Sequence, residues 1–288
     1  MSVLAFWFRA VVCSAVNLMN GLVAIWWSSR CNHPEIGRAR ADPSRLSRKY
    51  RTRRYSLPFL EAGRWRSMNY CMRSFQHWSA RYLLDRSVQK LDAATHQGRP
   101  WFTRQANQIL DSLLRPTDEG LEFGSGRSTV WLAGRVRQLT SVEHDPEWHG
   151  VVSSQLRTHG RHNVEYVFEP ETVPDSDGAD SGYAKIAMRF PDRSLNFVIV
   201  DGRYRDACAA LALPKIEPGG FLIIDDVNWY LPSDSRSPNS RRPHQGPDGS
   251  TWCEVDSVLR TWRSIWTSDG VTDTAFFLRP CTGMTGNV

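Results

Sequence analysis

Acidic residues follow several short apolar stretches of this sequence, and one of them stands beside a pair of glycines. Glu122 precedes Gly124 and Gly126 in the stretch LEFGSGRST, residues 121–129. A carboxylate at a strand end, next to glycines that let the backbone turn tightly and approach a ligand, is how α/β sheets hold nucleotide-like cofactors. An ordinary glycine turn between a strand and a helix would give the same pattern, so the other motifs have to decide.

Further polar residues end three other apolar stretches, LTSVEHD, LNFVIVDG and GGFLIIDD. These residues are Glu143, His144, Asp145, Asp201, Asp225 and Asp226. Any one of the acids could be a helix cap or a turn carboxylate. The carboxyl ends of parallel strands meet at one edge of a sheet, where ligands bind. We therefore expect these side chains to border one site.

Strand-like and helix-like stretches alternate from Pro100 onward. The expected strands cover residues 120–123, 139–145, 163–169, 195–202 and 219–226, and the expected helices cover 100–114, 128–136, 146–160 and 204–216. Ser128 is expected to cap the second of these helices, and Gly160 to follow the end of the third. This alternation predicts an α/β fold with a parallel sheet covered by helices on both faces.

The spacing of two acids predicts a nucleoside cofactor. Glu143 lies 21 positions after Glu122, and a carboxylate at this place can accept hydrogen bonds from both ribose hydroxyls. Thr129 stands where the dinucleotide pattern GxGxxG has its third glycine, and Glu122 would repel a pyrophosphate at the turn. An acid there suits a cofactor with an ammonium group and a sulfonium.

In this order, the motifs resemble those of class I S-adenosylmethionine-dependent methyltransferases, from about Pro100 to Pro280. The resemblance implies a three-layer, doubly wound, Rossmann-like α/β fold. Its mostly parallel seven-stranded sheet would end in a C-terminal antiparallel hairpin, for which SIWTSDGVTDTAFFLRP, with Gly270 at the turn, is the candidate. The cofactor contacts implied are Glu122, Gly124, Ser125, Gly126, Ser128, Glu143, His144 and Asp201, with Phe168 and Glu169 bordering the adenine.

The same resemblance implies methyl transfer to a hydroxyl of a small molecule or a glycan. Asp201 is the candidate general base, and His144 either accepts a proton or packs beside the cofactor. Tyr204, the third candidate catalytic residue, stands where catechol-type enzymes have a lysine base. Asp201, Asp225 and Asp226 would bind Mg²⁺ in a metal-dependent enzyme, since this ion prefers oxygen ligands. The missing lysine counts against a metal.

Two other functions fit a sheet of this kind. One is a nicotinamide-dependent oxidoreductase, against which the missing third glycine and Glu122 both count. The other is a non-catalytic domain that keeps only cofactor binding or a partner surface. The acids retained at the strand ends count against that alternative.

The first 54 residues differ from the rest of the chain in charge. They carry ten Lys and Arg against two acids, a charge of +8, so the remainder carries −2 of the net +6. This distribution argues against a nucleic-acid groove in the main body. We divide the chain into a hydrophobic and then basic extension (1–54), a helical lead-in (55–99) and a methyltransferase domain (100–288).

Residues 10–27 carry no charge, end in Trp26-Trp27 and precede a basic stretch. This pattern predicts membrane contact, either by a transmembrane helix or by a helix lying on the surface, with the body of the protein in the cytoplasm. A targeting segment and a poorly ordered start of the chain are the alternatives. The six cysteines form no CxxC pair, which is typical of free thiols in a reducing compartment.

The stretch 231–250 is rich in Pro, Ser and Gly, and predicts a mobile loop at the catalytic edge of the sheet. It is either a lid over the substrate or a plain surface insertion. As a lid, its residues Arg236, Arg241 and Arg242 would meet an anionic acceptor.

Overall fold

The computed structural model describes residues 79–96 and 98–281. The extension 1–54, with its apolar stretch 10–27, and much of the expected lead-in lie outside the described residues. Within the described ranges, no helix is long and apolar enough to cross a bilayer. The prediction of membrane contact therefore remains a prediction.

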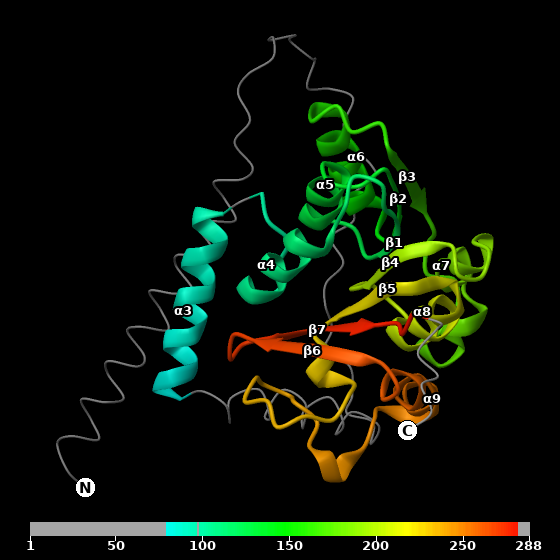
Figure 1. Ribbon diagram of the computed structural model, residues 1–288. Coiled ribbons are helices and arrows are strands. Elements are labelled where there is room, and N and C mark those ends of the chain that lie inside the picture. Colours follow the sequence, from blue (N-terminus) through cyan, green and yellow to red (C-terminus); the bar gives the residue numbers. More distant parts are fainter. Residues whose placement is uncertain (1–78, 97, 282–288) are drawn as a thin grey trace, which may run out of the picture. The chain divides into compact units, whose positions relative to one another are not determined.

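A seven-stranded sheet in the order β3-β2-β1-β4-β5-β7-β6 organises the described chain (Figure 1). Its strands are β1 (Glu119–Phe123), β2 (Gln138–Glu143), β3 (Val164–Phe168), β4 (Leu195–Val200), β5 (Ile216–Asp225), β6 (Arg263–Ser268) and β7 (Asp273–Leu278). The first five strands are parallel, while β7 is antiparallel to both β5 and β6. The predicted fold, including its C-terminal hairpin, is confirmed.

Helices cover both faces of this sheet. They are α4 (Arg104–Leu113), α5 (Arg127–Ala133), α6 (Pro146–Thr158), α7 (Gly182–Lys185), α8 (Arg205–Ala212) and α9 (Gly249–Leu259). The described chain also contains α3 (Ala80–Thr95), which has no buried residue. Short 3-10 turns occur at η2 (Asp175–Asp180), η3 (Ile186–Arg189), η4 (Leu213–Lys215), η5 (Val227–Trp229) and η6 (Pro243–Gln245). One hydrophobic core joins α4 and α5 to the sheet, and a second joins α7, α8 and α9 to it. The two cores make the three layers.

Burial follows the position of each strand in the sheet. The central strand β4 has five of its six residues buried, whereas the outer strands β3 and β6 are largely exposed or half-buried. Strands covered on both faces need nearly continuous apolar sequence. This is why LNFVIV was recognisable as a strand.

The helix ends correct one expectation and confirm another. Gly126 is the residue at the N-cap of α5, and Ser128 lies inside the first turn, so the prediction that Ser128 caps this helix is wrong. Asp145 caps α6, where its carboxylate accepts hydrogen bonds from the backbone N–H groups of Glu147 and Trp148. Gly160 follows the end of α6 with φ +59°, as predicted from the αL preference of that position.

Candidate active site

The order of the strands along the sheet reverses between β1 and β4. The turns that follow these two strands are in backbone contact. Gly124 has φ +93°, and a Cβ on it would lie 2.7 Å from the carbonyl carbon of Asp201 and from the nitrogen of Gly202. The N–H of Asp201 donates to the carbonyl of Phe123 at 2.8 Å. Only glycine meets both demands at position 124. In open α/β sheets, ligands bind where the strand order reverses in this way.

A cavity of about 450 Å³ opens at this edge of the sheet. It is lined by Trp101, Gly124, Ser125, Gly126, Arg127, Ser128, Glu143, His144, Asp145, Trp148, Asp201 and Gly202. Three of the lining side chains are carboxylates, contributed by the ends of β2 and β4. The cavity is therefore suited to a ligand that carries positive charge.

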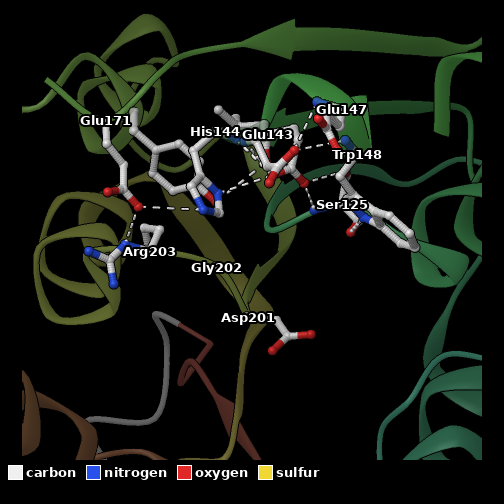
Figure 2. A network of polar contacts seen from close by, with 12 residues as sticks. Ser125, Glu143, His144, Glu147, Trp148, Glu171, Asp201, Gly202 and Arg203 are labelled. Carbon is white, nitrogen blue, oxygen red and sulfur yellow. Dashed lines mark hydrogen bonds and ion pairs between the residues drawn. The ribbon is translucent and has the colours of Figure 1, made fainter. Parts of the chain in front are cut away.

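Glu143 at the end of β2 is held firmly against the glycine turn (Figure 2). Its Oε2 accepts hydrogen bonds from the N–H and the hydroxyl of Ser125, at 3.2 and 2.6 Å. Its Oε1 accepts from the N–H groups of His144 and Asp145, both at 2.9 Å. The hydroxyl of Tyr166 lies 2.7 Å from that of Ser125. The carboxylate is thus fixed in place, and its partner Ser125 has a second partner of its own.

A chain of close polar contacts runs from Glu143 to the surface (Figure 2). His144 Nδ1 lies 3.0 Å from Glu143 Oε1, and His144 Nε2 lies 3.5 Å from Glu171 Oε1. Glu171 also pairs with Arg203 at 2.5 Å, and Arg203 with Asp175 at 2.6 Å. These contacts tie the segment after β3 to the ends of β2 and β4.

Glu122 is completely buried and braces the glycine turn from beneath the cavity. Its Oε2 accepts hydrogen bonds from the hydroxyls of Thr129 and Ser141, both at 2.6 Å, while Oε1 has no hydrogen-bond partner. Thr129 in turn accepts from the N–H of Gly126 at 2.9 Å. Burial is the main cause that raises the pKa of Glu122 to about 7, because the ionised form loses its hydration.

Asp201 at the end of β4 is paired with Arg205 in the first turn of α8. The guanidinium lies 3.0 Å from the Asp201 carboxylate and 3.7 Å from that of Asp226. Burial is the main cause that raises the pKa of Asp201 to about 6, Arg205 lowers it, and Asp226 raises it. The Asp201 side chain keeps 28% of its surface exposed, and this residue lines the cavity.

Comparison with known proteins bears on this arrangement. Residues 121–227, which include the end of β1 and all of β2 to β5, match a family model described as a methyltransferase domain. This part of the chain is therefore similar to methyltransferase domains. No curated protein matches the sequence.

Solved structures with similar folds include a methyltransferase-like protein from Silicibacter pomeroyi, which is 23% identical with a TM-score of 0.43 and aligns over 66% of this chain and 93% of its own. An N-methyltransferase from Bradyrhizobium japonicum is 16% identical with a TM-score of 0.39, over 62% and 96% of the two chains. An rRNA methylase from Streptococcus thermophilus is 13% identical with a TM-score of 0.40, over 61% and 95%. Likenesses at this level carry no argument about the acceptor.

The fold brings most of the expected site residues to one cavity. Those that line it are Gly124, Ser125, Gly126, Ser128, Glu143, His144 and Asp201. Glu122 and Tyr204 are not among the lining residues. Glu122 lies beneath the turn, and the Tyr204 hydroxyl donates a 2.6 Å hydrogen bond to the carbonyl of Val173. The expectation that these two side chains meet a ligand thus gains no support from the geometry.

The aspartates expected to bind Mg²⁺ are not arranged as a metal site. Among the described residues, no group of three His, Cys, Asp or Glu side chains is placed to hold a metal ion. Arg205 lies against Asp201 and Asp226, Thr274 donates to Asp225 at 2.5 Å, and Thr272 donates to Asp226. The geometry therefore does not support the magnesium prediction for Asp201, Asp225 and Asp226, because protein donors lie against these carboxylates.

Four lining residues were not expected at the cavity, namely Trp101, Arg127, Trp148 and Gly202, whereas Asp145 was among the strand-end residues expected to border the site. Arg127 stands between two residues that were expected, Gly126 and Ser128, and its place in the motif could have indicated it. Trp148 is held by a hydrogen bond from its indole N–H to the carbonyl of Ser125, at 2.9 Å. No sequence spacing connects Trp101 to the glycine turn.

The segment 231–250 does not contribute to this cavity, since none of its residues lines it. Arg241 bonds to Asp248 and to the carbonyl of Gly246, and Arg242 to the carbonyl of Ser235. Ser237 is buried and donates to Asp273 at 2.5 Å. The interpretation of this segment as a lid thus finds no support, and its mobility remains a prediction.

Proposed function

We propose that this domain binds S-adenosylmethionine at the carboxyl ends of β1, β2 and β4 and transfers its methyl group to a hydroxyl of an acceptor. The observation that supports this most strongly is the shared cavity, in which the Gly124 turn lies beside the carboxylates of Glu143 and Asp201. The family match to a methyltransferase domain covers all three strand ends. Small-molecule and glycan acceptors both remain within the proposal.

The charged groups that line the cavity fit this cofactor. S-adenosylmethionine carries a sulfonium and an ammonium group, and the carboxylates of Glu143, Asp145 and Asp201 border the cavity. Opposite charges at short range in a partly enclosed site attract more strongly than in water. A pyrophosphate cofactor would meet repulsion from the same three groups.

The surroundings of Glu143 fit a ribose. The Glu143 carboxylate accepts four hydrogen bonds from nearby residues, and one of the donors is the hydroxyl of Ser125. That hydroxyl lies 2.7 Å from Tyr166, so a ribose hydroxyl can take its place on Glu143 while Ser125 keeps a partner. The exchange costs little, because the number of hydrogen bonds is preserved.

When bound, S-adenosylmethionine supplies an activated methyl group, and the protein positions the acceptor and removes its proton. Asp201 is the proposed general base. Its pKa of about 6 leaves the carboxylate ionised at neutral pH and close enough to the operating pH for efficient proton transfer. His144 is bracketed by Glu143 and Glu171, and we assign it to holding the segment after β3 beside the cofactor.

Calorimetric titration of the full-length protein with S-adenosylhomocysteine and with NADH tests the cofactor. We expect S-adenosylhomocysteine to bind, NADH to give no heat of binding, and Glu143→Gln to weaken S-adenosylhomocysteine binding. Binding of NADH alone would identify a nicotinamide enzyme instead. Methyl-labelled cofactor incubated with a metabolite extract then tests the reaction. Tight cofactor binding without transfer of label to any component would show a non-catalytic domain.

A further inference from the structure

One wall of the cavity differs in charge from the rest. Among the described residues that line it, Arg127 is the one Lys or Arg, and the other lining residues that carry full charge are the carboxylates of Glu143, Asp145 and Asp201. The guanidinium carbon of Arg127 lies 5.3 Å from the ring centroid of Trp101. A cation above an aromatic face is stabilised by the ring, so the two side chains form one unit at the cavity wall.

Trp101 is exposed, but its backbone is firmly held. The side chain keeps 62% of its surface accessible, while the carbonyls of the residues on either side, Pro100 and Phe102, accept hydrogen bonds from the buried Asn107 amide at 3.1 and 3.2 Å. Thr103, which follows directly, caps α4 and bonds to Thr267 at 2.6 Å. The backbone that carries the ring is therefore held in place beside the cavity.

We infer that Trp101 and Arg127 form a carboxylate-binding wall in this cavity. A guanidinium matches the geometry of a carboxylate, and one that stacks on a ring is already oriented to bind it. The inference rests on the proposed function. It assigns to these two side chains the one anionic group of a methionine-derived cofactor, or the carboxylate of an acidic acceptor that bears a ring against Trp101.

The first possibility is that the wall binds the carboxylate of the cofactor. It is tested by titrating the full-length protein with S-adenosylhomocysteine and with 5′-methylthioadenosine, which lacks the amino-acid end. Arg127→Gln is expected to weaken S-adenosylhomocysteine binding on the order of 10-fold to 100-fold and to leave methylthioadenosine binding unchanged. Trp101→Leu is expected to weaken the first ligand by a smaller factor. Circular dichroism shows whether each variant is folded.

Arg135→Gln is the matched control. Arg135 also stacks on a tryptophan, with its guanidinium carbon 3.6 Å from the ring centroid of Trp131, but it does not line the cavity. Binding of both ligands should be unchanged in this variant. A loss like that of Arg127→Gln would show an effect of general charge and would overturn the inference.

The second possibility is that the wall binds the carboxylate of an acceptor. It is tested by titrating protein saturated with S-adenosylhomocysteine with 4-hydroxybenzoate and with phenol. If Arg127→Gln spares S-adenosylhomocysteine but abolishes a preference for 4-hydroxybenzoate, the wall binds the acceptor's carboxylate. If the variant changes neither the discrimination between the two nucleosides nor that between the two phenols, the inference fails and the proposed function stands. If the unmodified protein binds neither nucleoside, the proposed function fails as well.

Discussion

Asp201 combines exposure to the cavity with a raised pKa, and the proposed reaction depends on its ionised form. The pKa of about 6 predicts a rate that rises as the pH passes through 6 and becomes constant above about 7. Asp201→Asn should lower the turnover number by about 10² to 10⁴ and remove this inflection. Methyl transfer to an acceptor found in the metabolite screen, measured from pH 5 to 8.5, checks both expectations. An unchanged profile in the variant would exclude Asp201 as the base.

Glu122 is buried with one oxygen unpartnered, and this predicts a dependence of stability on pH. Its folded-state pKa is about 7 against an ordinary value of 4.5, so between these values the folded protein binds more protons than the unfolded chain. Stability should therefore fall as pH rises through this window, by about 3 kcal/mol in total. Glu122→Gln keeps an acceptor for Thr129 and Ser141 and should remove that fall.

Urea unfolding of both proteins at pH 5 and pH 8 measures the difference. Glu165→Gln is the control, because Glu165 is exposed on β3 and should leave the pH dependence unchanged. Equal pH dependence in Glu122→Gln and the unmodified protein would contradict the prediction.

Gly124 and Gly126 look alike in the sequence and differ in their structural demands. Alanine at 124 would have φ +93° and a Cβ 2.7 Å from the backbone of Asp201, whereas Gly126 has φ 170° and its Cβ would meet nothing closer than the Trp148 ring at 4.0 Å. Gly124→Ala should cost about 2 to 4 kcal/mol of stability, and Gly126→Ala under about 1 kcal/mol. Thermal unfolding of the two variants compares them directly. Equal losses would contradict this account.

At the scale of elements, the sequence predicted which strand ends form the site. It did not predict which of their side chains face the cavity and which are buried. Alternating apolar stretches located β1 to β5, so Glu143 and Asp201 could be placed at one edge. Whether an acid faces the cavity or lies beneath it depends on packing. Glu122 is buried against Thr129 and Ser141, and the sequence alone does not reveal this.

The other differences between the expected and the observed site come from side chains outside the strand ends. Trp101 precedes α4 and reaches the cavity only through the tertiary fold, since no local pattern links it to the glycine turn. Arg205 follows Asp201 by four positions, a pair that the sequence contains. Its contact with Asp226, at 3.7 Å, depends on the pairing of β4 with β5. That contact is one reason why the geometry does not support the predicted magnesium site.

The cluster formed where β4, α8 and β5 meet predicts a reaction that does not need a divalent metal. Arg205 compensates the charge of Asp201 and Asp226, and threonine hydroxyls from the β6–β7 hairpin donate to Asp225 and Asp226. The rate of methyl transfer should therefore be the same in EDTA and in millimolar Mg²⁺. A rate that falls in EDTA and recovers with Mg²⁺ would show that this cluster rearranges to bind a metal.

At the scale of the whole molecule, the positive charge and the proposed cofactor site belong to different parts of the chain. The basic excess belongs to residues 1–54, and the rest of the chain carries a charge of −2. The cavity is lined by residues from Trp101 to Gly202. The contact of the extension with a membrane and its cytoplasmic orientation remain predictions.

A chain that begins at Ser79 should therefore keep the binding site. Ser79 accepts a hydrogen bond from the N–H of Tyr82 and caps α3, and both hydrophobic cores are formed by residues after Pro100. The affinity for S-adenosylhomocysteine, measured by calorimetry, should be the same within about twofold for residues 79–288 and the full chain. Carbonate extraction of membranes should release the shortened protein completely, and a retained full-length protein would assign membrane contact to residues before Ser79. A shortened protein that is folded by circular dichroism yet binds no S-adenosylhomocysteine would show that the extension completes the site, because all the described lining residues would still be present.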